Sequence, residues 1–219
     1  MSSTTTWIST ERLAEHGELG GIMVRLMMAL QDFALADHSM GTWKAEEDHK
    51  LQDRKVGAVR YFLRLQLSHV FEAFEIIKEI EEQCELRAAV DACDRQTVKA
   101  YQTVIEFMKG DDYNLLLRIR NNIGFHYGRK VALQSLKRLE KRPNKNGALT
   151  IGNEALTWYF EPTEWVENDV IVHGIFGLPE DEEPTDLSAK TDDIVMRLHN
   201  IAHAFGDFAG YFIKGHAKI

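Results

Sequence analysis

The sequence contains little cysteine and little proline: two cysteines, Cys84 and Cys93, and four prolines among 219 residues. Two cysteines cannot build a disulfide framework or a cysteine-based zinc site, so we expect free thiols in a reducing compartment. The N-terminal residues show no basic segment followed by an apolar one, and no run approaches the roughly 18 apolar residues of a membrane span. There is no glycine-rich phosphate loop and no Gly-x-Ser-x-Gly sequence, which leaves nucleotide hydrolysis and α/β-hydrolase chemistry without support. These absences favour a soluble cytoplasmic protein that does not associate with membranes.

Charge is divided unevenly along the chain. The 26 Lys and Arg against 34 Asp and Glu give a net charge of −8, which would repel nucleic acid from the molecule as a whole. Residues 113–145, however, hold nine basic residues against one acid, or +8, and residues 161–193 hold one against eleven, or −10. The basic stretch would suit a phosphate chain. The alternatives are that the acidic stretch folds back on it or that a partner's acidic surface covers it, and the sequence leaves them open.

Apolar residues recur at three- and four-residue intervals over most of the chain, a pattern that predicts long amphipathic helices. The clearest helix is predicted over residues 51–83, which contain no proline and one glycine and carry this pattern from Val56 to Ile80. We expect a bend between helices around Cys84 and Cys93. The same spacing predicts further helices over residues 20–37, 95–109, 113–141 and 187–213.

Residues 147–177 show a different pattern. Short runs rich in β-branched and aromatic residues, at 149–151, 156–160 and 170–176, are separated by turn residues and indicate two or three strands. The predicted fold class is all-α, an antiparallel bundle of long helices with a small β-hairpin insertion near 147–177. We expect one domain over residues 1–219, with a helical core at about 20–142 and 186–215 and a strand and loop insertion at about 143–185.

One group of residues inside the basic stretch is a candidate catalytic site. Arg120 is followed by the polar Asn121 and, after five intervening residues, by His126. This pattern resembles the motif of ribonucleases in the HEPN superfamily (higher eukaryote and prokaryote nucleotide-binding domains), where an Arg and a polar residue precede a His at such spacing. The phrase Arg-Asn-x-x-x-Phe-His-Tyr is also similar to one found in HEPN-like proteins of bacterial defence and abortive-infection loci. The resemblance covers seven residues and implies a helical bundle, RNA cleavage without a metal or cofactor, and a dimer whose paired motifs form one cleft.

The side chains themselves suit that reaction. His126 would accept the proton of a ribose 2′-hydroxyl that attacks the adjacent phosphate, and Arg120 would stabilise the charged transition state. Asn121 is the polar second position of the motif, and Asn122, four residues before His126, would orient its ring. On a straight helix Arg120 and His126 lie about 120° apart and about 9 Å along the axis, so we expect a loosened turn at Gly124 or two copies of the helix. Candidates for holding flanking phosphates or bases are Arg118, Tyr127, Arg129 and Lys130.

The leading hypothesis is therefore an endoribonuclease of the bacterial toxin or antiviral-defence type, which acts on RNA as a homodimer and is controlled by an antitoxin or another defence-system protein. The alternative is a non-catalytic HEPN-like module that binds nucleic acid or an acidic partner. A third hypothesis is a metal-dependent helical enzyme, because His199, His203 and Asp207 share one helix face. A structural role for these three residues is favoured, and we expect no metal.

Overall fold

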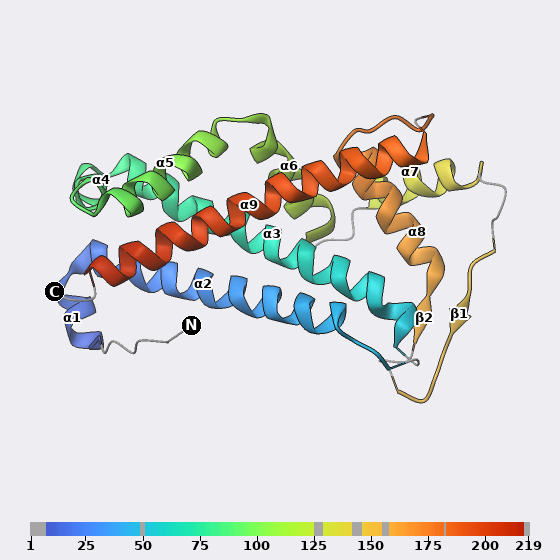
Figure 1. Cartoon of the computed structure of the whole chain (residues 1–219), viewed down its shortest axis with the longest axis horizontal. Coiled ribbons are helices and arrows are strands. Elements are labelled where there is room, and N and C mark those ends of the chain that lie inside the picture. The colour runs from blue at the N-terminus through green and yellow to red at the C-terminus, as the bar shows by residue number, and fades with distance from the viewer. Residues whose placement is uncertain are drawn as a thin grey trace. The chain divides into compact units, whose positions relative to one another are not determined.

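The computed structural model of this chain describes residues 8–48, 51–124, 129–141, 146–154, 158–181 and 183–216, and this part is built mainly from helices (Figure 1). The α-helices in chain order are α1 (Thr10–Glu15), α2 (Gly17–Lys44), α3 (Gln52–Glu82), α4 (Cys84–Asp91), α5 (Arg95–Met108), α6 (Asp111–Ile119), α7 (Arg129–Leu139), α8 (Glu161–Asp169) and α9 (Pro184–His216). Two π-helical segments are η1 (Arg120–Gly124) and η3 (Val170–Ile175). The strands β1 (Leu149–Thr150) and β2 (Tyr159–Phe160) pair antiparallel, with Leu149 opposite Phe160. The predicted all-α fold with a small β-hairpin is confirmed.

Four of the five helices predicted from the apolar spacing are present as single helices. α3, α5 and α9 lie at the ranges expected from the apolar spacing, and α2 extends the expected helix at both ends. The start of α5 shows the local cause, because the Asp94 carboxylate accepts a hydrogen bond from the Thr97 amide at 2.8 Å. Such a cap satisfies one of the amides that the first turn of a helix leaves without a partner.

Two predictions of local structure are wrong. The single α-helix expected over 113–141 is interrupted, since α6 ends at Ile119 and the π-helical η1 follows it. The interruption expected around the cysteines lies between α3 and α5, and it contains α4, whose eight residues are too few for a periodic pattern. The strand considered at 170–176 is η3, and it follows α8, which was not predicted. Burial explains η3: Val170, Val172 and Ile175 are buried, and packing of these β-branched residues overrides their preference for strands.

The described residues form two compact units, each assembled from segments that are distant in the sequence. Unit 1 comprises Met1–Leu35, His69–Tyr113 and His199–Ile219, and unit 2 comprises Ala36–Ser68 and Asn114–Leu198. The long helices α2, α3 and α9 therefore contribute residues to both units. The expectation of a single domain over residues 1–219 stays a prediction.

Unit 1 has an aromatic core. The rings of Tyr101 and Phe208 lie 4.9 Å apart between centroids, and Phe208 also contacts Phe212 at 5.5 Å. Phe74 of α3 contacts Phe205 of α9 at 6.1 Å. All five side chains are fully buried. Aromatic rings of this size contribute much of the apolar area that a small core removes from water.

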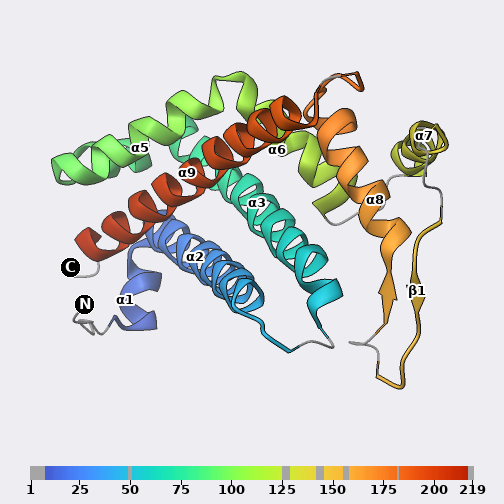
Figure 2. The same ribbon diagram turned by 45° about the vertical axis from the view of Figure 1, so that its right-hand side comes forward.

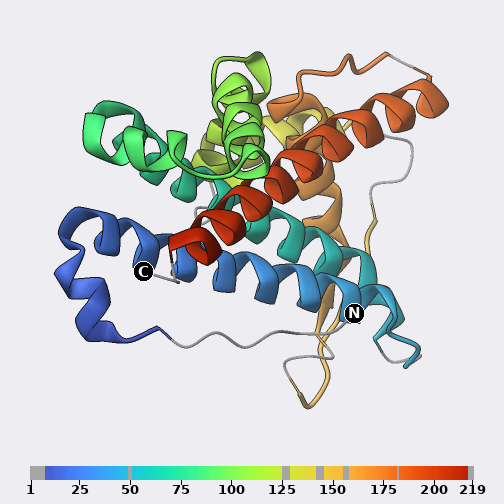
Figure 3. The ribbon, with the colours of Figure 1, turned by 60° about the vertical axis from the view of Figure 1, so that its left-hand side comes forward.

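Within the described residues, α2 is the one helix that is long and apolar enough to cross a membrane, with an 18-residue window of mean hydropathy 1.4. This corrects the expectation that no run approaches that length. The core helix of a soluble protein passes the same test when it is mostly buried, whereas 33% of this window is buried in the structure. In unit 1 Arg25 of α2 pairs with Glu79 of α3, and a Cβ added to Gly206 of α9 would lie 3.9 Å from Leu30 Cδ2 of α2. Figure 3 shows the C-terminal part of α9 close to α2.

In unit 2 the second strand leads directly into α8, and α8 continues into η3 (Figure 2). α7 packs against both α8 and η3. Arg138 of α7 donates two hydrogen bonds to Asp169 Oδ2, from Nε at 2.8 Å and from Nη2 at 2.6 Å, and Asp169 is only 3% exposed. This buried ion pair fixes α7, which begins with two of the predicted RNA-binding residues.

Candidate functional site

The motif residues Arg120, Asn121 and Asn122 lie in η1, the π-helical turn that follows α6. Arg120 Nη1 donates a hydrogen bond to Asn121 Oδ1 at 3.0 Å, and Asn122 Nδ2 donates to the Arg118 carbonyl at 2.8 Å. Hydrogen bonds in a π-helix join residues five apart, so its turn is wider than an α-helical one. The straight α-helix on which the angle of about 120° between Arg120 and His126 was calculated therefore does not continue through Arg120–Gly124. Single π-turns are frequent at functional sites.

The other predicted residues differ in exposure and in whether they are described. Among the described ones, the exposed side chains are Arg118, Asn121, Arg129 and Lys130. Arg120 and Asn122 are partly buried. His126 and Tyr127 lie outside the described residues, so the pairing of Arg120 with His126 stays a prediction. The structure thus brings together Arg118 with Asn122 and Arg120 with Asn121.

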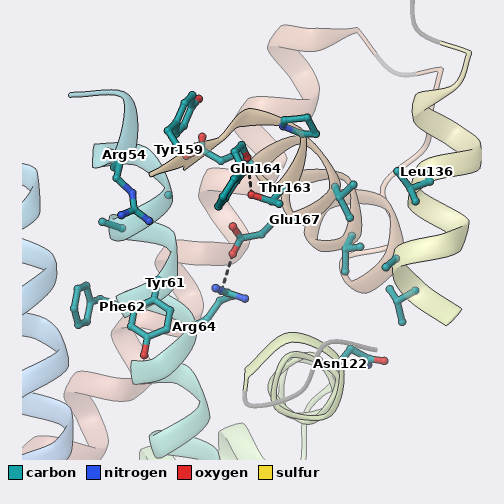
Figure 4. Close-up of a pocket in the computed structure, with 18 of the residues that line it drawn as sticks. Arg54, Tyr61, Phe62, Arg64, Asn122, Leu136, Tyr159, Thr163, Glu164 and Glu167 are labelled. Atoms are coloured by element: carbon teal, nitrogen blue, oxygen red, sulfur yellow. Dashed lines mark hydrogen bonds and ion pairs between the residues drawn. The ribbon is translucent and has the colours of Figure 1, made fainter. Parts of the chain in front are cut away.

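Unit 2 contains a cavity of about 920 Å³, and Asn122 forms part of its wall (Figure 4). α3 and α8 contribute most of the wall, and α7 contributes Val131, Ala132 and Leu136. The aromatic wall residues are Trp43, Tyr61, Phe62, Tyr159 and Phe160. The ionisable and amide-bearing side chains in the wall are Arg54, Arg64, Asn122, Glu164 and Glu167. A mainly apolar cavity of roughly 300–1,000 Å³ with a few polar groups is typical of small-molecule sites.

An ion pair links α3 to α8 across this cavity. Arg64 Nε lies 2.7 Å from Glu167 Oε1, and the two side chains are 13% and 17% exposed. Figure 4 shows Glu167 reaching from α8 toward Arg64 on α3. Burial raises the pKa of the Glu167 carboxyl above its ordinary value, although Arg64 and Arg60 act in the opposite direction. The cost of removing the charge from water therefore exceeds the attraction of the two arginines.

Glu164, one turn before Glu167 on α8, lies against the backbone of α3. A Cβ added to Gly57 would lie 2.6 Å from Glu164 Oε1, so the glycine allows this close approach. Burial raises the pKa of the Glu164 carboxyl, and the neighbouring Glu167 and Glu161 act in the same direction. Arg60 and a backbone hydrogen bond from Gly57 lower it. A carboxylate held in this way is an acceptor of fixed position in the wall of the cavity.

Sequence reasoning missed this cavity because its wall comes from four separated stretches of the chain. One signal was present: Gly57 is the single glycine of the helix predicted over 51–83. A glycine inside a helix costs stability relative to alanine, so its presence points to a close approach by another group. The sequence alone did not indicate that the approaching group is Glu164.

The two oppositely charged stretches meet at one place in unit 2. Arg138 pairs with Asp169, and Lys141 Nζ lies 3.5 Å from Glu180 Oε2. The acidic stretch thus partly neutralises the C-terminal part of the basic stretch. This agrees with the alternative in which the acidic stretch folds back on the basic one. Arg129 and Lys130, at the other end of α7, are exposed to solvent.

The histidine pair on α9 lies in unit 1. His199 Nε2 and His203 Nε2 are 2.9 Å apart, so the two rings do meet. Among the described residues no three His, Cys, Asp or Glu side chains come together as metal ligands, and Asp207 does not complete a site with the pair. In the part of the chain that the structure describes, the two histidines have no third ligand of the kind that catalytic zinc sites use.

Both cysteines are free thiols, as predicted. Cys93 Sγ lies 3.5 Å from His216 Nε2 in unit 1. Burial raises the pKa of the Cys93 thiol, with a further rise from Asp94, and burial lowers the pKa of the His216 imidazole. Both shifts favour a neutral pair, whereas a nucleophilic cysteine needs a stabilised thiolate. This pair is therefore not an activated nucleophile.

Comparisons with known proteins add no relatives to these observations. No family model, no curated protein and no solved structure matches the chain.

Proposed function

We propose that this chain is a metal-independent endoribonuclease of the HEPN-like bacterial toxin or antiviral-defence type. The observation that carries the proposal is the position of the motif Arg-Asn-x-x-x-x-His: it begins in a π-helical turn whose Asn122 borders a ligand-sized cavity. The exposed Arg129 and Lys130 support it, because they offer positive charge three and four residues after His126 in the chain.

In the proposed reaction the neutral imidazole of His126 accepts the proton of a ribose 2′-hydroxyl, and the 2′-oxygen attacks the adjacent phosphorus. The bond between phosphorus and the 5′-oxygen breaks, and the departing oxygen takes a proton from an imidazolium. Arg120 stabilises the phosphoryl oxygens in the transition state. Asn121, which accepts a hydrogen bond from Arg120, holds the guanidinium in place. The products are a 2′,3′-cyclic phosphate and a free 5′-hydroxyl.

The partners in this proposal are RNA, a second copy of the chain and an antitoxin or other defence-system protein. A second copy follows from the resemblance, in which paired motifs form one cleft. Control by another protein follows from the harm that unrestrained RNA cleavage does to a cell. The place of action is the cytoplasm, where RNA is available, and no membrane takes part.

The proposal is tested by incubating the purified full-length chain with a mixed set of RNAs in EDTA. General acid–base catalysis contributes about 10²- to 10⁴-fold, so His126→Ala should lose at least about 100-fold in rate. Arg120→Ala should also lose activity. His199→Ala, which changes a histidine of unit 1, is the matched control and should cleave as the wild type does. Intact RNA with the wild type, or equal cleavage by His126→Ala, contradicts the proposal.

A non-catalytic binding module is the second candidate function. One observation favours it: the basic stretch is partly neutralised within unit 2 at Arg138 and Lys141, while Arg129 and Lys130 remain exposed. In this case RNA binding should weaken steeply with salt. Neutralising Arg129 and Lys130 together should flatten that dependence, and His126→Ala should have no effect on binding.

A further inference from the structure

The charged groups of the cavity balance one another. Its wall carries two arginines, Arg54 and Arg64, and two glutamates, Glu164 and Glu167. Arg64 and Glu167 are paired with each other, and Arg60 of α3 acts on both carboxyls from outside the wall. The charges of these four wall groups cancel, so the charge arrangement favours a neutral ligand over a phosphate.

The wall is also rich in hydrogen-bond acceptors. Asn122 donates through Nδ2 to the Arg118 carbonyl, which leaves Oδ1 as its acceptor. The Thr163 hydroxyl donates to the Phe160 carbonyl at 2.6 Å, so the lone pairs of the hydroxyl oxygen can accept a hydrogen bond. Glu164 adds a carboxylate, whose hydrogen bonds are charge-assisted and stronger than neutral ones. A neutral ligand that fits this wall carries several donors.

The aromatic side chains of the wall favour a ligand that is planar as well as neutral. Tyr61 and Phe62 of α3 and Tyr159 and Phe160 of the second strand lie in the wall, and Tyr61 is 47% exposed. Unpaired RNA bases are recognised by stacking on such rings combined with hydrogen bonds to their edges.

We propose that the cavity of unit 2 binds a guanine base turned out of a bound RNA strand, with the Glu164 carboxylate accepting hydrogen bonds from the N1–H and 2-amino groups. Guanine presents these two donors side by side, which matches the two oxygens of one carboxylate. Glu164 Oε1 also lies against the backbone of Gly57, and a carboxylate oxygen has a second lone pair for the base. Adenine and cytosine present one amino group beside a ring acceptor, and uracil presents one N–H between two carbonyls. Those acceptors would face the carboxylate and weaken binding.

The surroundings of the cavity agree with an RNA ligand. Asn122 in the wall is two residues after Arg120, and α7 lines the cavity with Val131, Ala132 and Leu136 directly after the exposed Arg129 and Lys130. Phosphates would bind to the basic side chains at the start of α7 while one base enters the cavity. The inference rests on the proposed function only in taking RNA as the source of the base.

The test uses nucleosides, which carry no phosphate and so report on the cavity alone. Guanosine, inosine, adenosine and uridine are titrated into the full-length chain by calorimetry. Guanosine should bind best, and inosine, which lacks the 2-amino group, should bind several-fold more weakly. Glu164→Gln should lose guanosine affinity by at least about tenfold, because one acceptor oxygen becomes a donor. Glu140→Gln, an exposed glutamate outside the cavity wall, is the matched control and should bind as the wild type does.

Gly57→Ala provides a second variant that does not depend on removing the carboxylate. The new Cβ would displace Glu164, since it would lie 2.6 Å from Oε1, while alanine favours the helix. Guanosine affinity should fall although the helix content by circular dichroism is retained. The inference is overturned if no nucleoside binds, if all four bind equally, or if Glu164→Gln binds guanosine as the wild type does.

The two proposals fail separately. If guanosine binds selectively but the wild type leaves RNA intact in EDTA, the cavity inference stands and the endoribonuclease proposal falls. If RNA is cleaved with dependence on His126 but no nucleoside binds, the reverse holds.

Discussion

Unit 1 and unit 2 are built on different principles. Of the twelve largest fully buried side chains in the described part of the chain, ten belong to unit 1, and they include the five aromatic residues of its core. Of the twelve large apolar side chains that are exposed, nine belong to unit 2. Unit 1 uses its apolar residues for packing, whereas unit 2 leaves many of them on its surface or around a cavity.

The two units also differ in their buried charged groups and in the regularity of their helices. Unit 2 buries Asp169 against Arg138, holds Arg64 against Glu167, and contains both π-helical segments. Burying charge and interrupting a regular helix both cost stability, and proteins accept such costs mainly at functional sites. In the described part of the chain, unit 1 therefore concentrates the aromatic packing, whereas unit 2 contains the π-helical segments, the buried ion pairs and the cavity.

The largest effect should come from breaking the core of unit 1. Phe208→Ala removes a fully buried ring that contacts Tyr101 and Phe212, and should lower the free energy of unfolding by about 3–5 kcal/mol. Leu136→Ala, a residue of unit 2 that is 51% exposed, should cost less than about 1 kcal/mol. Urea unfolding followed by circular dichroism measures both. Equal losses for the two variants would mean that the two units do not differ in packing.

An intermediate effect is expected at the buried charge of unit 2. Asp169→Asn removes the partner of Arg138 and should destabilise the protein by about 3 kcal/mol, because it leaves a guanidinium largely buried without its carboxylate. Glu180, which lies 4.0 Å from the same arginine, is 52% exposed, so Glu180→Gln should change stability by less than about 0.5 kcal/mol. Thermal unfolding at neutral pH distinguishes them. A small effect of Asp169→Asn would show that the ion pair between Arg138 and Asp169 contributes little to stability.

The smallest effect concerns the cavity and depends on pH. The pKa of Glu164 is raised above its ordinary value of 4.5, so the folded protein binds this proton more tightly than the unfolded chain does. The resulting stabilisation is fully present below pH 4.5 and is lost as the pH rises through the raised pKa. Glu164→Gln carries no such proton, so its melting temperature should increase relative to the wild type between pH 4 and pH 7. A constant difference in melting temperature between Glu164→Gln and the wild type would contradict the raised pKa.

The apolar spacing of the sequence was enough to predict the long helices and the all-α fold, since burial of one helix face follows the same period as the helix. It did not predict the π-helical turn at Arg120–Gly124, because the periodic positions continue from Leu116 to Leu139. It also indicated a strand where η3 forms, because β-branched residues favour strands until tertiary packing decides otherwise.

The candidate site was predicted in part. The motif around Arg120 and the exposed basic residues at the start of α7 were found from residue types and spacing. The cavity beside them was not, because Glu164, Arg64 and Asn122 are distant in the sequence and have no common pattern. The sequence suggested the contact between Arg138 and Asp169 only in general form, as the alternative in which the acidic stretch folds back on the basic stretch.

What the sequence by itself determined is local: where helices form, where charge accumulates, and which residues are able to handle a proton or a phosphate. Each of these depends on residues within a few turns of one another. The tertiary structure alone decided that α6 ends in a π-helical turn, that Gly57 admits Glu164, and that one end of the basic stretch is neutralised while the other is exposed. These depend on contacts between distant segments, whose free energies are not encoded in any short stretch of the chain.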